Sequence, residues 1–412
     1  MLKKNKDQRK GLKLVKLLMF VIFLFVVLVP LNFINKDKQI LNIETDNEVK
    51  EESFKENNYE ISLVMVGDAL IHDDIYLDAK EGDTYNFSKM LAQVKPIVRN
   101  YDLAYYNQET ILGGEELGLS SYPAFNSPYE VGDAFLEAGF SLVSLATNHT
   151  LDRGEKAVIN SRNYWNSKTA NSNDSILAVG SYVSDEERNQ VQIRSINNIT
   201  YTMLNYTYGT NGIKVPVGKE YLVNVWPVTG NNPATDISYQ NYKETVRKDI
   251  EAVRDKVDLL MVAMHWGIEY QTTPNSYQKD MASFLANLGV DIIIGTHPHV
   301  IQPIEWIDDT LVIYSLGNFI SAHEVVNIDN RVGLMSSVTI TKTIEEDNTT
   351  ITLDNLSNEL LYTYYTGDYK SFKVIPFSNL TEEYLSNYKS IYLRYKDIIQ
   401  SIDNSINVSP ID

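Results

Sequence analysis

The stretch VDIIIGTHPH, residues 290–299, joins a short apolar run to a glycine and two closely spaced histidines. The run Val290–Ile294 has the length and composition of a buried strand, and polar residues begin where it ends. If the segment is extended, His297 and His299 point the same way, and Gly295 lets the backbone turn closely beside them. An α/β sheet presents a site in this way, at the carboxyl edge of its strands.

Three further polar segments follow apolar runs in the same manner. They are Gly67–His72 after Ile61–Val66, Asn148–Asp152 after Ser141–Ala146, and His265–Glu269 after Leu259–Met264. Together with residues 295–299 they contain five of the six histidines; His323 stays unassigned. The four segments predict one site assembled from distant parts of the chain at a shared sheet edge.

Strands and helices alternate through most of the chain, which predicts an α/β sheet. Further strands are expected at Leu103–Tyr106, Ile176–Val179 and Tyr201–Tyr206, and helices at Phe87–Val98, Tyr129–Ala138, Gly154–Ser167, Tyr242–Lys256 and Ser276–Leu288. Beyond residue 310 strands dominate, at Leu311–Ser315, Arg331–Thr341, Thr350–Leu353 and Leu360–Tyr364, before a helix at Thr381–Gln400. These late strands predict a second sheet packed on the first.

The N-terminus has the pattern of a signal-anchor. Residues 1–16 are strongly basic, residues 17–34 are apolar, and no small-x-small cleavage site follows. This predicts a cytoplasmic basic segment, one uncleaved transmembrane helix and an extracellular remainder, with residues 35–58 as a polar stalk. The alternative is a buried core helix, which would not need basic residues at one end only.

Composition excludes several classes of function. The formal charge is −18, and the first sixteen residues carry seven basic and one acidic side chain, so the rest carries about −24. Such a surface does not hold nucleic acid non-specifically. The chain has no cysteine, which excludes disulfides, thiolate nucleophiles and cysteine-ligated zinc.

The strand ends hold the residue types that a metal centre requires. They are Asp68, Glu109, Asn148, His265, His297 and His299, which supply carboxylates, an amide oxygen and imidazoles. Each has an ordinary alternative: Asp68 as a helix cap, Asn148 in a turn, His265 in packing, and Glu109 as a charged residue at a strand end.

Six motifs resemble those of the CapA family of poly-γ-glutamate capsule-biosynthesis proteins. In family order they are Val66-Gly67-Asp68, Asn107-Gln108-Glu109, Thr147-Asn148-His149 with Asp152, His265-Trp266-Gly267 with Glu269, Gly295–His299 with Gln302, and Tyr314–Phe319. The resemblance runs from about Glu60 to Phe319. It implies a calcineurin-like metallophosphoesterase fold, an α/β/β/α sandwich of two packed sheets, with a domain at 59–325 that residues 326–412 complete.

The resemblance also implies roles for the site residues. Glu109 resembles a bridging carboxylate; Asn148, His265 and His297 resemble ligands of one ion, and Asp68 and His299 those of another. His149, oriented by Asp152, would protonate a leaving group. The ions would be Mn, Zn or Fe, one or two in number. Leu70 stands where the family pattern has a histidine; His72 replaces it if the chain turns helical after Asp68. Glu269 and Asn318 are auxiliary candidates.

The implied function is a membrane-anchored extracellular protein of capsule poly-γ-glutamate synthesis or export. One hypothesis is a metal-dependent hydrolase or transferase acting on a phosphoester or a γ-linked amide. The other is a non-catalytic subunit or scaffold of the polymer synthase or export complex. The expected partners are the membrane, an anionic polymer such as poly-γ-glutamate and other capsule synthase subunits, and no nucleic acid.

Overall fold

A computed structural model describes residues 57–172, 175–226, 229–323, 327–346 and 348–411. The predicted basic segment, the signal-anchor and the stalk up to residue 56 lie outside these ranges. Within them, no helix is both long and apolar enough to cross a bilayer.

The first sheet has the strand order β16-β15-β14-β1-β4-β5-β6, with β13 also paired to β1. Its strands are β1 (Asn57–Ala69), β4 (Leu103–Asn107), β5 (Leu142–Ser144), β6 (Leu177–Val179), β13 (Asn318–Ile320), β14 (Val332–Glu345), β15 (Asn348–Tyr364) and β16 (Lys373–Pro376). The strands β1, β4, β5 and β6 run parallel, so their carboxyl ends meet at one edge. The long strand β14 pairs antiparallel with β1.

The second sheet has the order β11-β12-β10-β9-β8-β7. Its strands are β7 (Arg194–Ile196), β8 (Ile199–Thr207), β9 (Leu259–His265), β10 (Ile292–Thr296), β11 (Ile304–Ile307) and β12 (Thr310–Ile313). The central strands β8, β9, β10 and β12 are parallel. A separate hairpin joins β2 (Lys80–Glu81) to β3 (Thr84–Tyr85).

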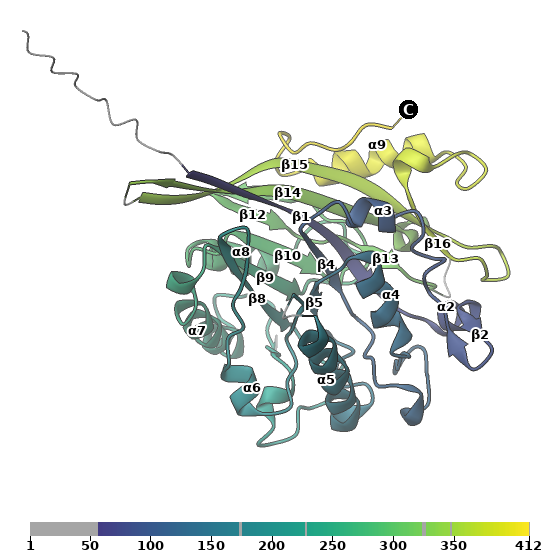
Figure 1. Ribbon diagram of the computed structural model, residues 1–412, viewed down its shortest axis with the longest axis horizontal. Coiled ribbons are helices and arrows are strands. Elements are labelled where there is room, and N and C mark those ends of the chain that lie inside the picture. Colours follow the sequence, from purple (N-terminus) through teal and green to yellow (C-terminus); the bar gives the residue numbers. More distant parts are fainter. Residues whose placement is uncertain (1–56, 173–174, 227–228, 324–326, 347, 412) are drawn as a thin grey trace, which may run out of the picture. The chain divides into compact units, whose positions relative to one another are not determined.

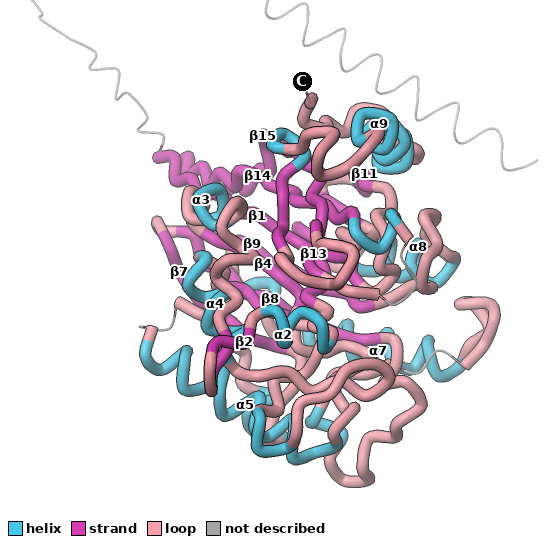
Figure 2. The backbone as a smooth tube through the Cα atoms, turned by 90° about the vertical axis from the view of Figure 1, so that its right-hand side faces the viewer, coloured by secondary structure: helices cyan, strands magenta, loops and turns pink. Residues whose placement is uncertain are grey.

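The two sheets face each other across the main core, and helices cover their outer faces (Figures 1 and 2). Side chains alternate along β1: Ile61, Leu63 and Met65 enter the core between the sheets, whereas Val64 and Val66 pack outward. The helices α4 (Glu130–Ala138) and α5 (Gly154–Asn171) cover the first sheet, and α7 (Ile237–Glu251) and α8 (Ser276–Ala286) cover the second. The structure is therefore an α/β/β/α sandwich, as predicted.

Further helical segments complete the described chain. They are α2 (Asp73–Asp78), α3 (Lys95–Val98), α6 (Asp185–Asn189), α9 (Tyr388–Ile399) and 3-10 turns at Glu115–Leu117, Glu220–Leu222, Arg254–Lys256, Ile328–Arg331 and Phe377–Asn379. The predicted helix at Phe87–Val98 is wrong for most of its length, because turns precede α3. Pro96 lies in the first turn of α3, where its missing N–H is not needed.

The prediction that the late strands form the second sheet is wrong except for the strand predicted at Leu311–Ser315, which is observed as β12 in that sheet. The edge of β1 opposite β4 is taken by β14, so β14, β15 and β16 extend the first sheet. The second sheet comes instead from the middle of the chain. The two strands predicted within 350–364 are one strand, β15, and the last helix is shorter than predicted.

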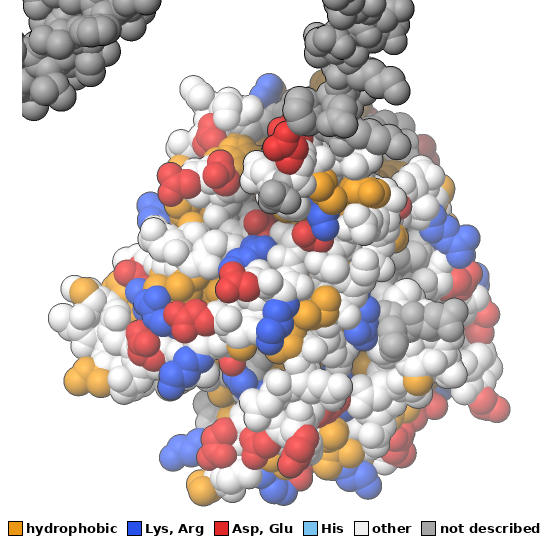
Figure 3. Space-filling model, turned by 60° about the vertical axis from the view of Figure 1, so that its left-hand side comes forward, with side chains coloured by type: hydrophobic (Ala, Val, Ile, Leu, Met, Phe, Trp, Pro, Cys, Tyr) orange, Lys and Arg blue, Asp and Glu red, His pale blue; other side chains and the backbone are white. Residues whose placement is uncertain are grey.

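Acidic and basic side chains are interspersed on the face of the molecule shown in Figure 3. The described chain also contains paired charges, as in Arg188 with Asp249 at 2.7 Å and Lys342 with Asp258 at 2.8 Å. Although the net charge of the chain is negative, this face does not show a single continuous acidic surface.

Candidate metal centre

Six polar residues predicted from separate motifs meet where the strands of both sheets end. Asp68 lies in β1, Glu109 follows β4 and Asn148 follows β5, whereas His265 ends β9 and the other two histidines follow β10. Glu109 Oε1 is 3.6 Å from His265 Nε2 and 3.8 Å from His299 Nε2. The Asp68 carboxylate is 3.6 Å from His299 Nδ1, and Asn148 Oδ1 is 2.9 Å from His265 Nε2. The predicted convergence is therefore present, across two sheets rather than at the edge of one.

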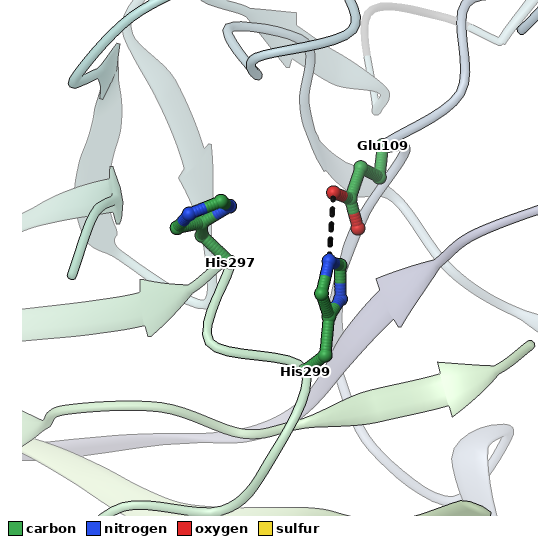
Figure 4. Close-up of side chains that lie close together, drawn as sticks. All are labelled: Glu109, His297 and His299. Carbon is green, nitrogen blue, oxygen red and sulfur yellow. Dashed lines mark ion pairs between the residues drawn. The ribbon is translucent and has the colours of Figure 1, made fainter. Parts of the chain in front are cut away.

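Glu109, His297 and His299 form a cluster within this group that could hold a metal ion (Figure 4). One potential ligand atom from each lies within 4.8 Å of the other two, and all three side chains are buried. Both carboxylate oxygens of Glu109 and Nδ1 of His297 lack a hydrogen-bond partner among the described residues. Buried polar atoms are rarely left in this state unless an ion or other ligand satisfies them.

The loop that carries the two histidines is not extended, contrary to the expectation from their spacing. His297 has a φ of 96° and His299 a φ of 59°, both in the left-handed region that favours glycine. Gly295 lets this loop approach β12, because a Cβ there would lie 2.0 Å from the carbonyl oxygen of Tyr314. The histidines converge on Glu109 through this turned backbone, which is a strained form typical of functional sites.

Asp68 is fixed by hydrogen bonds to both of its carboxylate oxygens. Asn107 Nδ2 donates to Oδ1 at 2.8 Å, and the backbone N–H of His297 donates to Oδ2 at 3.2 Å. Asn107 is itself held by Ser144 Oγ at 2.6 Å. The helix-cap alternative for Asp68 is wrong, since His72 occupies the N-cap position of α2. The sequence motif did not predict a role for Asn107, and the structure reveals its hydrogen bond to Asp68.

Hydrogen bonds set which nitrogen of each imidazole faces the centre. Asn318 must present Nδ2 to the carbonyl oxygen of Asn330 at 2.9 Å, so its Oδ1 accepts from Nδ1–H of His299 at 3.0 Å. Nδ1 of His265 likewise lies 3.0 Å from Thr296 Oγ1. Both histidines then direct Nε2 toward Glu109. Metal-binding histidines are commonly oriented by such a bond at the opposite ring nitrogen.

The centre contains ionisable side chains whose charged forms are destabilised by burial. Burial, reinforced by Asp68, raises the pKa of Glu109 well above its usual range. Burial opposes a charge on His299, but Glu109 and Asp68 outweigh it and raise the pKa of His299 to about 9. Glu109 and His299 are one buried pair that retains a proton above neutral pH. Burial lowers the pKa of His265 and His297 well below 6.5, so both are neutral, as metal ligation requires.

His149 lies beside the centre and is paired with Asp152, as predicted. Its Nδ1 is 2.7 Å from Asp152 Oδ2, which also accepts from the backbone N–H of Phe125 at 2.7 Å. Asn211, which the sequence interpretation missed, connects this pair to the centre. Its Oδ1 accepts from Asn148 Nδ2 at 3.2 Å, and its Nδ2 lies 3.2 Å from His149 Nδ1. The Asn211-Gly212 turn was the only signal in the sequence.

The centre opens into a cavity of about 820 Å³. The auxiliary candidates His72 and Glu269 line it, together with Leu70, which is buried. The condition under which His72 would replace the missing ligand is not met, because β1 continues to Ala69 and α2 begins only at Asp73. The backbone N–H of Ala322 donates to His72 Nδ1 at 3.1 Å. Burial lowers the pKa of His72 to about 4.

The sandwich and its buried cluster of carboxylate and imidazole groups define an α/β protein whose site is compatible with a divalent cation. The chain belongs to the bacterial capsule synthesis protein family PGA_cap, whose model matches residues 62–323. The resemblance to CapA proteins drawn from the motifs is thereby confirmed.

Two curated relatives and a solved structure show similarity. The PGA biosynthesis protein CapA of Bacillus subtilis (strain 168) is 29% identical over 184 residues, which are 45% of this chain and 43% of that protein. The capsule biosynthesis protein CapA of Bacillus anthracis is 26% identical over 274 residues, 64% of this chain and 60% of that protein. The chain thus spans less than two thirds of the length of either. A 5'-nucleotidase from Candida albicans SC5314 aligns with 85% of this chain and 59% of its own, at 14% identity and a TM-score of 0.41.

Proposed function

We propose that the chain binds a divalent cation at Glu109, His297 and His299 and acts as a metal-dependent hydrolase or transferase in making capsule poly-γ-glutamate. The observation that carries this proposal is the Glu109 carboxylate, whose two oxygens are buried among histidines without a hydrogen-bond donor. A buried carboxylate is costly unless it is paired or coordinates a metal.

The donor set fits a cation of borderline softness. A carboxylate and several imidazoles, with no thiolate, suit Mn, Fe or Zn. His265 and the amide oxygen of Asn148 lie next to the three central residues and would complete the ligand set. A cation bound there would act as a Lewis acid on an oxygen of the substrate.

His149 is placed to move a proton. Its Nδ1 lies 2.7 Å from Asp152 Oδ2; in the protonated imidazole Nδ1–H would donate to that carboxylate, and the proton on Nε2 would be the one passed to a leaving group. The side chains of both residues line the cavity. The protein's contribution to a cleavage step would be to donate this proton and to hold the substrate beside the centre.

One ion fits the centre better than two. The second ion would need Asp68, whose oxygens already accept bonds from Asn107 and His297, and position 70 supplies only leucine. The same observation favours the second candidate function, a non-catalytic subunit or scaffold in which the site is structural. For the enzyme and for the scaffold alike, we propose the calcineurin-like ancestry that the motifs imply.

We also propose a location and partners for the protein. The basic and apolar N-terminal residues support a single-pass membrane anchor with the domain outside the cell. The names of the two CapA relatives support a role in capsule synthesis. The expected partners are the anionic polymer, the membrane and other synthase subunits.

Metal analysis of the purified full-length chain tests the centre. We expect about one equivalent of Mn, Fe or Zn, lost in His297→Ala and His265→Ala and retained in Asn358→Ala. Asn358 is a matched control because it is also fully buried but lies on β15, where its Nδ2 donates to Asn407. A parent chain without metal would rule the proposal out.

Activity separates the enzyme from the scaffold. A γ-glutamyl amide and a phosphodiester should be tested as substrates with the parent chain and with His149→Ala. The enzyme proposal predicts that turnover falls while metal content stays. Absence of turnover, together with co-purification of synthase subunits that persists in the metal-free variants, would favour the scaffold.

A further inference from the structure

A row of three histidines runs from the centre into the cavity. The ring centroids of His299 and His323 are 5.3 Å apart, and those of His323 and His72 are 5.1 Å apart. Only His299 is near enough to Glu109 to act as a ligand. His72 and His323 are therefore left without a role in the centre, although both line the cavity.

The hydrogen bonds of His323 fix its tautomer. Asn318 Nδ2, whose orientation is set by the carbonyl oxygen of Asn330, also lies 3.2 Å from His323 Nε2. A donor at that position requires a lone pair on Nε2, so the proton of the neutral ring is on Nδ1. No residue that the structure describes accepts a hydrogen bond from this N–H.

His72 has the opposite tautomer. The backbone N–H of Ala322 and the carbonyl oxygen of Leu70 both lie 3.1 Å from its Nδ1. The Leu70 oxygen already accepts from the backbone N–H of His72, whereas the buried N–H of Ala322 has no other acceptor in the described chain. Because orphaned buried N–H groups are rarer than under-used carbonyls, Nδ1 accepts and Nε2 carries the proton.

We propose that Nε2–H of His72 and Nδ1–H of His323 form a subsite that holds an uncharged amide carbonyl oxygen of the substrate. The proposal rests on the proposed function and refines it, because it favours a γ-linked amide over a phosphoester. Two neutral N–H donors beside the centre match the acceptor of an amide backbone.

The charges around the cavity favour an uncharged group over an oxyanion at the two histidines. Four carboxylate side chains line it, those of Asp73, Asp74, Asp152 and Glu269, and none of its described lining residues is lysine or arginine. Phosphate and carboxylate groups are ordinarily held by arginine or lysine. An uncharged carbonyl group is not repelled by these carboxylates.

Ring-nitrogen NMR of the full-length chain labelled with ¹⁵N-histidine tests the donor pair without any ligand. Only six histidines need to be assigned. We expect the Nε2–H tautomer for His72 and the Nδ1–H tautomer for His323. The reverse tautomer at either residue would overturn the proposal, whatever the metal content.

Binding of a γ-linked glutamate tetramer tests the subsite itself. His72→Phe and His323→Phe keep a ring but lose the N–H, so each should weaken binding about three- to tenfold. Metal content should not change, and Tyr122→Phe on the same cavity wall should bind as the parent does. An amide-capped tetramer, in which every α-carboxylate has been converted to an amide, should lose the same factor, and phenyl phosphate should lose none.

Three results would contradict the subsite. The first is a loss of affinity confined to the uncapped tetramer, and the second is an equal loss of affinity for phenyl phosphate. The third is tetramer affinity that is unchanged in both variants, or no tetramer binding by the metal-containing parent. A parent chain without metal would instead contradict the proposed function, and the NMR experiment would still decide the tautomers.

Discussion

Asn211 Oδ1 accepts a hydrogen bond from Asn148 Nδ2 at 3.2 Å, and this bond decides which end of the Asn148 amide faces His265. With Nδ2 engaged, the amide oxygen is directed at His265 Nε2, 2.9 Å away. A residue on the loop after β8 therefore orients a candidate ligand on the loop after β5.

Replacing Asn211 should weaken metal binding without touching a ligand. We expect Asn211→Ala to lower metal affinity roughly tenfold, as is typical when a supporting hydrogen bond is lost. Asn211→Asp keeps an acceptor for Asn148 and should recover most of the affinity. Competition with a chelator measures both; if the aspartate variant binds as weakly as the alanine variant, the orientation argument fails.

Glu109→Gln should abolish the stabilisation of the protein by metal. In metal-free protein the change removes one partner of the buried Glu109–His299 pair, so the melting temperature should fall. Added metal should raise the melting temperature of the parent, by binding the folded state, and not that of the variant. Scanning calorimetry with EDTA or with metal measures the difference, and an equal response to metal in both proteins would contradict the assignment.

The metal-free protein should lose stability as pH rises from about 6.5 to about 9. The pKa of His299 is raised from 6.5 to about 9, because Glu109 and Asp68 outweigh the effect of burial. The folded state therefore holds a proton more tightly than the unfolded state, and that advantage is complete below pH 6.5 and gone above pH 9. Melting temperatures in EDTA across this range should fall, and His299→Gln should flatten the slope. A slope that is unchanged in the variant would show that another group is responsible.

Gly295→Ala should destabilise the protein and abolish metal binding together. The added Cβ would lie 2.0 Å from the carbonyl oxygen of Tyr314, so the loop that carries His297 must move. We expect a loss of several kcal/mol, as for other severe steric clashes. Gly209→Ala is the matched control, since no atom lies within 4 Å of its added Cβ. Denaturant unfolding and metal analysis of both variants provide the comparison.

The sequence predicted the members of the centre because each follows a buried parallel strand, and such strands end together. The apolar runs before Asp68, Asn148 and His265 were sufficient for that inference. Assignment of strands to sheets was beyond the sequence, because pairing is decided by long-range contacts: β1 pairs with β14, which is about 270 residues away in the chain.

Roles that depend on backbone conformation or on a second residue also escaped prediction. The spacing of His297 and His299 indicated an extended segment, whereas both adopt positive φ. His72 was expected to replace the ligand missing at Leu70 if the chain turned helical after Asp68, but α2 begins only at Asp73. Asn107 and Asn211 gave no periodic signal, because each acts through a single hydrogen bond to a residue distant in sequence.

The centre takes three of its six residues from strand ends and loops of each sheet, and Asp68 and His297 are 229 positions apart. A chain that has been synthesised or exported only as far as β8 would therefore hold Asp68, Glu109 and Asn148 without any of the three histidines of the centre. If the proposed cation binds here, its capture would be one of the last events in the maturation of this domain. The presence of the ion would report that both sheets have formed and have met in the correct register.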